Sequence, residues 1–397
     1  MASSTNAAPY LNSLRKLQGW IEGHNYRGYE PFDCLESYLR PLTFGTLLGE
    51  QLLQQVGRQC PINLRPLMGV KPQESSKGRG YIAWGHLLRY AATGEADHRA
   101  KAEMCLDWLD THKSKLYTKH AWGNTFDYAA RSGRIPKDEP TIVWTSLIGQ
   151  AYLLGYDLTK NERWLKVADS LCGWIMDLPR EVTPKGTCIS YVTYMQSSIH
   201  NSNMLGAAVL ARTAKHTGNQ EYLKLARAAM EYSCAGQLAD GAWYYGEATK
   251  HHWVDNFHTG YNLDSLKRYI EYAGDETFRP HLTKGYDYFL AHFIDPDGCP
   301  RYYHNRRQPI DIQGAAQVID TLVLFSDLVP SSLDLACKVA DWTIANMQDA
   351  DGHFYYRKYP LITAKAPMIH WGQATMFKAL AHLSSRLEAR AGTQRSA

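Results

Sequence analysis

The chain has 397 residues, of which 45% are hydrophobic, 12% aromatic and 21% charged, and this composition excludes a largely disordered protein. Its 43 basic and 39 acidic residues give a net charge of +4 with no long block of like charge, so nucleic acid is not expected as a partner. The chain starts without a signal-peptide pattern and has no apolar run of spanning length. We therefore expect a cytoplasmic protein with no membrane span.

The eight cysteines are scattered, and no two of them form a C-x-x-C pair. Neither a zinc ribbon nor a redox motif is therefore expected. Several cysteines fall inside stretches with helical periodicity, where a free cysteine usually serves as a small buried apolar residue. We predict no metal site and no cofactor.

Helical periodicity comes in pairs of stretches that are joined by short polar turns. Apolar residues recur at spacings of three and four, and β-branched alternation is scarce. An unpaired helical stretch covers residues 369–389. In chain order, the predicted pairs cover residues 78–94 with 99–113, 141–159 with 162–178, 201–218 with 221–237, 261–274 with 278–294, and 313–328 with 331–348.

The regular spacing of these pairs predicts the fold. A helix pair cannot bury its apolar face alone, so successive pairs must stack on one another. The first helices are apolar on all sides, as an inner ring requires, whereas the second helices are amphipathic. We predict an all-α protein, an (α/α)6 toroid, with an open solenoid as the alternative. The first helices start near Gly80, Pro140, Ser198, Thr259, Asp311 and Pro367, 52 to 61 residues apart.

No Pro- or Gly-rich linker divides the repeats, so we expect one toroid domain over residues 79–390. Residues 1–78 precede the first pair and are predicted to form N-terminal cap helices packed on the toroid. The polar residues 391–397 are predicted to be a flexible tail.

Asp-Gly steps followed by aromatic residues mark three of the returns between pairs, 57 and 54 residues apart. Asp-Gly is a typical turn sequence, and the aromatic rings can pack the return crossing. The same passages could also bring tyrosines to a binding cavity, where ring faces suit stacked sugars. The steps are Asp240-Gly241, Asp297-Gly298 and Asp351-Gly352, and the tyrosines are Tyr244, Tyr303 and Tyr356.

Polar residues gather at the predicted starts of the inner helices, which all meet at one mouth of a toroid. Such groups need a partner, solvent or a ligand. We expect His258 or Tyr261 to exchange a proton with the substrate while Asp255 orients it or acts as an acid, and His200 is the fourth catalytic candidate. The expected binding residues are Asn201, Asn203, Trp253, Asn256, Tyr244, Tyr303, Arg306, Arg307, Asp311, Gln313, Tyr356, His370, Trp371 and Gln373.

Structural roles compete with some of these assignments. Asp255 or Asn256 could cap its helix, and Asp311 could do the same after Pro309. Arg306 and its neighbour could clamp a carboxylate or could be solvated on a loop.

The helix pairs with aromatic loops resemble the α/α-toroid superfamilies: six-hairpin glycosidase-like enzymes, uronate polysaccharide lyases, N-acylglucosamine 2-epimerases and the C-terminal domains of glucuronyl C5-epimerases. The segments HNSNMLGAAVLAR, WVDNFHTGYNLDSLKRY, PIDIQGAAQVIDTL and FYYRKYPLITAKAPMIHWGQATMFKALA are similar to segments of bacterial proteins encoded with exopolysaccharide and capsule loci. This resemblance implies a saccharide substrate and a place in bacterial polysaccharide metabolism.

A second resemblance competes with the first. The segments from Gln237 to Trp243 and from Gln348 to Phe354 are similar to the QW repeats of triterpene cyclases and to repeats of protein prenyltransferases. The cyclase D-x-D-D motif is missing, because Asp351 is followed by Gly352. We interpret Asp297-Gly-Cys299 as a turn rather than as part of a zinc site.

The balance of side chains at the predicted mouth bears on the reaction. Hydrolysis needs two carboxylates about 5–10 Å apart, but only Asp255 and Asp311 lie at predicted mouth positions, whereas histidine and tyrosine abound there. This favours proton abstraction beside the carboxylate of a uronic-acid saccharide, as in C5-epimerases. A uronate lyase is the next alternative, and a glycoside hydrolase the third. An isoprenoid cyclase or transferase and a non-catalytic glycan-binding protein also remain open.

Overall fold

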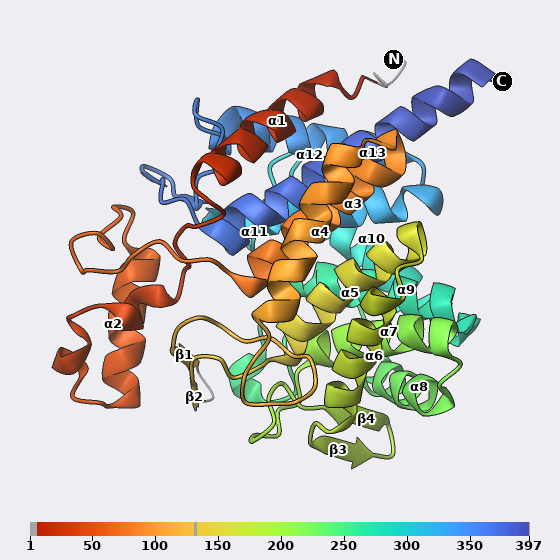
Figure 1. Ribbon diagram of the computed structural model, residues 1–397, viewed down its shortest axis with the longest axis horizontal. Coiled ribbons are helices and arrows are strands. Elements are labelled where there is room, and N and C mark those ends of the chain that lie inside the picture. Colours follow the sequence, from red (N-terminus) through yellow and green to blue (C-terminus); the bar gives the residue numbers. More distant parts are fainter. Residues whose placement is uncertain (1–5, 131–132, 397) are drawn as a thin grey trace.

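Paired helices make up most of the chain in the computed structural model, which describes residues 6–130 and 133–396 (Figure 1). The first helices of the pairs form an inner ring, and the second helices lie outside it. The inner helices are α3 (Ser76–Thr93), α5 (Ile142–Thr159), α7 (His200–Thr217), α9 (Asn256–Ala273), α11 (Ile312–Leu324) and α13 (Thr375–Ser396). The outer helices are α4 (Ala96–Thr111), α6 (Glu162–Met176), α8 (Gln220–Ala235), α10 (Arg279–His292) and α12 (Ser331–Met347).

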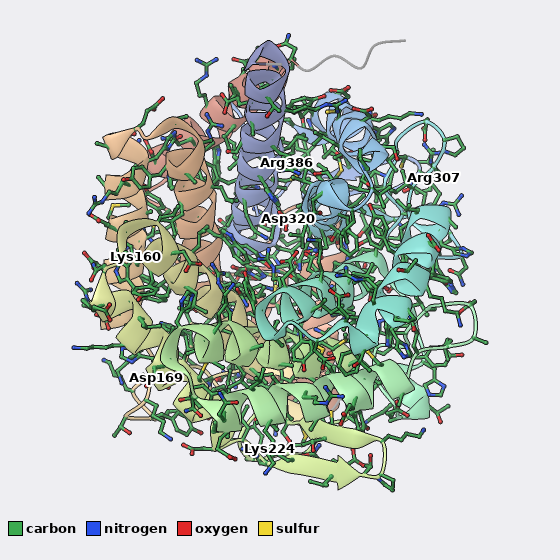
Figure 2. The ribbon with its side chains drawn as sticks, turned by 90° about the vertical axis from the view of Figure 1, so that its right-hand side faces the viewer. Lys160, Asp169, Lys224, Arg307, Asp320 and Arg386 are labelled. Atoms are coloured by element: carbon green, nitrogen blue, oxygen red, sulfur yellow. The ribbon has the colours of Figure 1, made fainter. Side chains whose placement is uncertain are left out.

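The inner ring is closed. Each inner helix contacts the next one in chain order, and the last, α13, returns to contact the first, α3. Figure 2 shows Asp320, on inner helix α11, within the ring of helices, while Lys160, Asp169 and Lys224 lie at its periphery. The all-α (α/α)6 toroid is therefore confirmed, and an open solenoid is excluded.

The sixth outer helix comes from the other end of the chain. Helix α1 (Ala8–Gly23) packs against α13, so the two ends of the chain form the last pair together (Figure 1). Its apolar face is buried through Leu14, Leu17 and Trp20. Helix α13 continues to Ser396 and so includes most of the predicted tail. The division of the chain at residues 78 and 390 stays a prediction.

The Asp-Gly turns have a structural role that explains their repetition. Gly241 and Gly352 have φ values of 101° and 104°, a left-handed conformation that favours glycine. Each glycine also lies against the backbone of the next outer helix, where a Cβ would meet the carbonyl of Lys284 in α10 or of Lys16 in α1. The turn sequence therefore seats each repeat on its neighbour.

The glutamine that precedes each of these turns ties the same two elements together. Gln237 donates to the carbonyl of His281 in α10, and Gln348 donates to the carbonyl of Ser13 in α1, at 3.0 and 3.2 Å. In the segments that are similar to QW repeats, the glutamine and the glycine therefore join one helix pair to the outer helix of the next.

Polar caps start several inner helices at one end of the ring. The side chains of Ser75, Thr141, Asp255 and Asp311 accept hydrogen bonds from backbone N–H groups in the first turns of α3, α5, α9 and α11. The inner helices are largely buried, and every residue of α7 from His200 to Ala214 is buried. None of the described helices combines the length and the apolar character that a membrane crossing requires.

Charged residues are buried in the centre of the inner ring. Lys378 and His382 approach Asp320 at 2.5 and 2.8 Å, and they hold the pKa of this carboxyl well below its usual range although burial opposes them. Burial and the neighbouring Asp320 raise the pKa of Asp264 to about 6. This network fills the centre of the ring beneath the capped ends.

Short strands and turns extend the capped ends of the inner helices. Helix α2 (Leu47–Gln59) projects from the ring beside a hairpin of β1 (Tyr128–Ala130) and β2 (Gly133–Ile135) (Figure 1). The other strands are β3 (Arg180–Thr183) paired with β4 (Gly186–Ile189), and β5 (Ile310–Asp311), β6 (Arg357–Lys358) and β7 (Thr363–Ala364) in one antiparallel sheet. The 3-10 helices are η1 (Asp33–Glu36), η2 (Arg40–Thr43), η3 (Thr249–His251), η4 (Glu276–Phe278) and η5 (Phe325–Asp327), and η6 (Ile369–Ala374) is a π-helix that leads into α13.

Candidate active site

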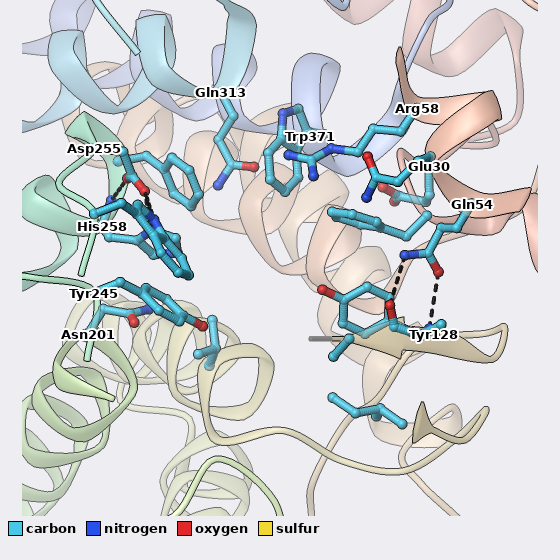
Figure 3. A pocket seen from close by; sticks show the side chains of 18 of the residues that line it. Glu30, Gln54, Arg58, Tyr128, Asn201, Tyr245, Asp255, His258, Gln313 and Trp371 are labelled. Atoms are coloured by element: carbon cyan, nitrogen blue, oxygen red, sulfur yellow. Dashed lines mark hydrogen bonds and ion pairs between the residues drawn. The ribbon is translucent and has the colours of Figure 1, made fainter. Parts of the chain in front are cut away.

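A cavity of about 1120 Å³ opens where the capped ends of the inner helices meet. One wall carries residues of the inner-helix ends, including His258, Tyr261 and Gln313. The opposite wall comes from α2 and β1, including Arg58 and Tyr128 (Figure 3). The volume exceeds that of sites for a single small ligand, so several sugar units fit.

His258 lines this cavity with a carboxylate behind it. Its Nδ1 lies 2.7 Å from Oδ2 of Asp255, which is buried (Figure 3). The same carboxylate accepts hydrogen bonds from the indole of Trp253, at 2.9 Å, and from the backbone N–H of His258, at 3.0 Å. Three donors therefore fix the carboxylate, and the carboxylate fixes the imidazole, whose Nε2 has no partner among the described residues.

A second imidazole with a carboxylate partner lines the same cavity. Nδ1 of His370, at the start of the π-helix, is in close contact with the carboxylate of Glu30, and the backbone N–H of His370 donates to the same carboxylate at 3.3 Å. Both ring nitrogens are buried, and neither forms a hydrogen bond of good geometry with a described residue, so the contact of Nδ1 with Glu30 is one of proximity. Burial lowers the pKa of His370, with Glu30 opposing this effect, so the ring is neutral near pH 7. π-helical turns frequently occur at functional sites.

The loop that carries Glu30 is held by a buried ion pair. Arg65 lies 2.7 Å from Asp33 and also donates to the backbone carbonyl of Glu30 at 2.7 Å. Asp33 in turn accepts from the backbone N–H of Glu30 at 2.8 Å. These contacts hold the loop that carries Glu30 in place against η6.

Tyr261 is the centre of a cluster of polar groups at the cavity floor. Its hydroxyl lies 2.8 Å from that of Tyr81, 3.0 Å from Nε2 of Gln313 and 3.4 Å from Nζ of Lys77. Burial raises the pKa of Tyr261, so the phenol stays protonated and can donate a hydrogen bond. The residue also lines a small pocket on the side of the buried Asp264, so it lies at the inner limit of the cavity.

The charges of the lining are predominantly positive. Glu30 and Asp255 are the carboxylates among the described lining residues, and each is paired with a histidine. Lys77, Arg58 and Arg306 line the cavity without an ion pair to any described carboxylate. The guanidinium of Arg58 lies 4.7 Å from the ring centroid of Phe32. This balance favours an anionic ligand.

Aromatic rings supply flat surfaces beside these polar groups. Tyr245 stacks on Trp253 with centroids 4.5 Å apart and lies 4.5 Å from the ring of His258. Phe257 and Trp371 meet edge to face at 5.5 Å. Rings with one polar edge suit the alternating apolar faces and hydroxyls of a saccharide.

The structure brings a large part of the predicted site together in this cavity. These residues come from separate helix pairs, as the convergence of inner-helix ends predicts. They are His258, Tyr261, Asp255, Asn201, Trp253, Tyr303, Arg306, Gln313, His370 and Trp371.

Two predicted residues near the start of α7 lie outside the cavity lining because of their position on the helix. His200 is turned toward Glu247, with Nε2 3.0 Å from the carboxylate. Asn201, one position later, lines the cavity, and its buried Oδ1 has no partner among the described residues. Asn203 donates to the carbonyl of Ala229 at 2.8 Å and joins α7 to α8. His200 and Asn203 therefore have structural roles behind the cavity lining.

Asp311 also lies behind the lining, where it positions two residues that belong to it. Its carboxylate accepts from the indole of Trp371 at 2.8 Å and from Nε of Arg357 at 2.6 Å. It also caps α11 by accepting from the backbone N–H of Gln313 at 3.0 Å. The predicted capping role is thus present, and contact with a ligand would be indirect.

Three more predicted binding residues lie outside the lining and have local partners. Arg307 approaches Asp297 at 2.5 Å in a loop ion pair. Gln373 exchanges two hydrogen bonds of 2.8 Å with the backbone of Phe354. Tyr356 is buried beside β6. Packing of the returns between helix pairs explains the polar or aromatic character of these positions.

The remaining two lie at the edges of the site. Asn256 donates its amide to the carbonyl of Arg301, which fixes the start of α9 against the next return. Tyr244 stacks on His252 with ring centroids 4.2 Å apart. Neither side chain belongs to the cavity lining.

Some lining residues were not predicted. Glu30 and Arg58 belong to the N-terminal segment, for which the sequence predicts only cap helices. No motif marks them, because their place in the site depends on how α2 folds over the mouth. Lys77 carries a signal that sequence reasoning could have used, since it lies at the start of a predicted inner helix like the other candidates.

One group of side chains among the described residues has the spacing of a metal site. Candidate ligand atoms of Asp349, Asp351 and His353 lie within 4.8 Å of one another. They belong to an Asp-Gly turn and not to the cavity lining. The hydroxyl of Tyr355 donates to Asp349, and the backbone N–H of His353 donates to Asp351.

No protein-family model and no curated protein matches the sequence. Solved structures with the same fold are found. A sugar epimerase from a ruminal bacterium has a TM-score of 0.60 at 12% identity, over 81% of this chain and 90% of that one. An unsaturated glucuronyl hydrolase specific for heparin has a TM-score of 0.60 at 13% identity, over 82% and 90%. A polysaccharide lyase has a TM-score of 0.60 at 12% identity, over 98% and 99%.

The chain therefore has the (α/α)6 toroid fold that these carbohydrate-active enzymes share. At such low identity the likeness establishes the fold, and the chemistry has to be argued from the cavity itself.

Proposed function

We propose that this protein is an enzyme that acts on a uronic-acid-containing saccharide and moves the proton on the carbon beside the carboxylate, as a C5-epimerase does. Epimerisation requires one group to remove the proton from one face of the carbon and another to return a proton to the opposite face. The predicted place of this enzyme is bacterial polysaccharide metabolism.

The observation that carries this proposal is the presence of two histidine–carboxylate pairs in one cavity. In each pair Nδ1 lies close to a buried carboxylate, with an aligned hydrogen bond in the pair of His258 and Asp255, so we assign the proton exchange to Nε2. Neutral His370 is suited to accept a proton, and His258 is suited to the complementary step. Tyr261 can donate a hydrogen bond to the enediolate that forms between the two transfers.

The positive lining supports a uronate rather than a neutral sugar. Lys77, Arg58 and Arg306 can balance a ligand carboxylate, and loss of a proton beside that carboxylate adds further negative charge. The aromatic rings around His258 support a saccharide.

A uronate lyase is the second candidate, for a specific reason. The likeness to a polysaccharide lyase extends over 98% of this chain, including the N-terminal segment that forms one cavity wall. A protonated Tyr261 could supply the proton that a departing O4 needs. A hydrolase is less well supported, because both lining carboxylates are engaged by histidines. An isoprenoid enzyme would need a lining without such a set of Asn, His and Arg side chains.

The test is incubation with glucuronate-, galacturonate- and mannuronate-containing oligosaccharides in deuterated water. Deuterium at C5 without chain cleavage, detected by NMR and mass spectrometry, supports the proposal. An unsaturated product absorbing near the 4,5-double-bond band indicates the lyase instead. New reducing ends without either signal indicate a hydrolase, and binding without any product indicates a glycan-binding protein.

A further inference from the structure

We propose that Lys77 forms an anion-binding site at the cavity floor, which receives the carboxylate of the substrate and takes up a proton as that carboxylate binds. The class of ligand rests on the proposed function. The site itself rests on the surroundings of the lysine.

Lys77 lies in the first turn of α3 and is 4% exposed, yet it lines the cavity. Its Nζ lies 5.0 Å from the ring centroid of Trp144 and 5.6 Å from those of Tyr81 and Tyr261. One hydrogen bond, of 3.4 Å to the hydroxyl of Tyr261, reaches this amine among the described residues. A lysine of this kind has aromatic walls and little solvent, but no ion pair.

No described carboxylate forms an ion pair with Lys77. Glu30, from the N-terminal segment, acts on it electrostatically, and the carboxylate of Glu30 contacts Nδ1 of His370 in η6. His370 from η6, Tyr81 from α3 and Tyr261 from α9 are the other titratable groups; burial lowers the pKa of His370 and raises the pKa of both tyrosines.

The charged groups behind the two tyrosines have partners of their own. Lys378, on α13, faces Tyr81 and pairs with Asp320, while Asp264 is bonded to Gln317 and Thr321.

Burial without a partner disfavours the charged form of an amine. It lowers the pKa of Lys77 to about 7, with Glu30 opposing the effect. An arriving carboxylate changes this balance because it supplies the missing counter-charge in a water-poor place. The amine then takes up a proton, and an N⁺–H···O⁻ hydrogen bond forms.

The position of Lys77 also matches the chemistry. The proton to be moved is on the carbon attached to the carboxylate, so the carboxylate must bind beside the groups that move it. Lys77 and His370 interact electrostatically, and Lys77 contacts Tyr261. Arg58 lies on the opposite wall, is partly exposed and is already cationic, so it is the rival site for the carboxylate.

The experiment measures binding through tryptophan fluorescence, using methyl β-D-glucuronide as the probe and methyl β-D-glucoside as its neutral match. With the wild-type protein, affinity for the glucuronide should fall about tenfold between pH 6 and pH 8, because the fraction of protonated Lys77 falls by that factor. Affinity for the glucoside should not change. Equal pH dependence of the two sugars, or no binding of the glucuronide at pH 6, would overturn the proposal.

Three variants separate the lysine from its surroundings. Lys77→Met should bind the two sugars alike at both pH values, whereas Lys77→Arg should keep the preference for the glucuronide and lose its pH dependence. Arg58→Gln removes one positive charge of the lining, so it should weaken binding of the glucuronide by a similar factor at pH 6 and pH 8 and leave the pH dependence in place. If Arg58→Gln removes the preference and Lys77→Met does not, the carboxylate binds at the rival site.

A measurement without ligand checks the amine directly. Competitive acetylation of the full-length protein, followed by mass spectrometry of the peptide containing Lys77, should give a midpoint near pH 7, and a midpoint near pH 10 would overturn the proposal. Binding as predicted without deuterium exchange would remove the proposed reaction and leave this site intact.

Discussion

The pair formed by Asp255 and His258 allows a prediction that follows atom by atom from the structure. Asp255→Asn keeps the shape of the side chain but replaces one acceptor oxygen by an NH₂ donor. In the native protein one oxygen accepts from Trp253 and contacts Nδ1 of His258, and the other accepts from the backbone of His258. Whichever way the amide is turned, a donor meets a donor.

The cost can be worked out from this conflict. One lost hydrogen bond with a buried donor left unsatisfied lowers the free energy of unfolding by about 1–3 kcal/mol. If the amide NH₂ faces Nδ1, it also forces the proton of the imidazole onto Nε2, so the nitrogen facing the cavity can no longer accept a proton. We expect turnover to fall by about 10²–10⁴-fold, the usual contribution of a general acid or base.

The assay is C5 deuterium incorporation per folded molecule, with folding followed by denaturant titration. Asn219→Ala is the matched control, because Asn219 caps outer helix α8 through the N–H groups of Glu221 and Tyr222, away from the cavity. This control should lose about 1 kcal/mol of stability and no turnover. A turnover of Asp255→Asn within a fewfold of the wild type would refute the reasoning.

Three further predictions concern the fold and its charges. Asn203→Ala should lower the free energy of unfolding by roughly 2–4 kcal/mol, because it leaves buried groups of β4 and α8 unpaired, while kcat/KM stays within about twofold; a selective loss of kcat/KM would contradict the structural role. Removal of residues 1–23 should abolish cooperative unfolding, because it uncovers the apolar face of α13, and an intact melting transition would show that α1 is dispensable. Because burial holds the pKa of Lys77 at about 7, below that of an unfolded lysine, the native protein binds fewer protons than the unfolded chain between pH 7 and about 10.5, and stability gains with pH in this window. Lys77→Met should therefore stabilise the fold most at pH 7 or below, with an advantage that shrinks toward pH 10, and a constant advantage would contradict this.

The repeat predicted the closed ring but not the helix that completes its outer layer. Helix pairs whose first helices start 52 to 61 residues apart predicted the inner and outer layers. The predicted starts lie near the observed starts of the inner helices. The sixth outer helix, α1, could not be assigned in this way because it lies at the opposite end of the sequence from its partner, α13. The Asp-Gly turn at Gly352 indicates that an outer helix lies beside it, because the equivalent turns at Gly241 and Gly298 each pack against an outer helix.

The site was predictable to the level of helix ends, and less so at single positions. One residue along a helix is a rotation of about 100°, so the sequence could not tell that Asn201 lines the cavity while His200 faces Glu247. Glu30 and Arg58 were not predicted, because they belong to the N-terminal segment, where no sequence periodicity indicates which side chains point toward the cavity. Asp311 was found, but its contacts place it behind Trp371 and Arg357.

The central claim is that two histidines work on opposite faces of one carbon, and hydrogen exchange from each epimer tests it most directly. With the pair of epimeric uronates in deuterated water, the wild-type protein should place deuterium in the product of either direction. His258→Gln and His370→Gln should each abolish epimerisation but keep exchange into one epimer, and into a different epimer in the two variants. Exchange of both epimers by either variant, or unchanged epimerisation, would contradict the account.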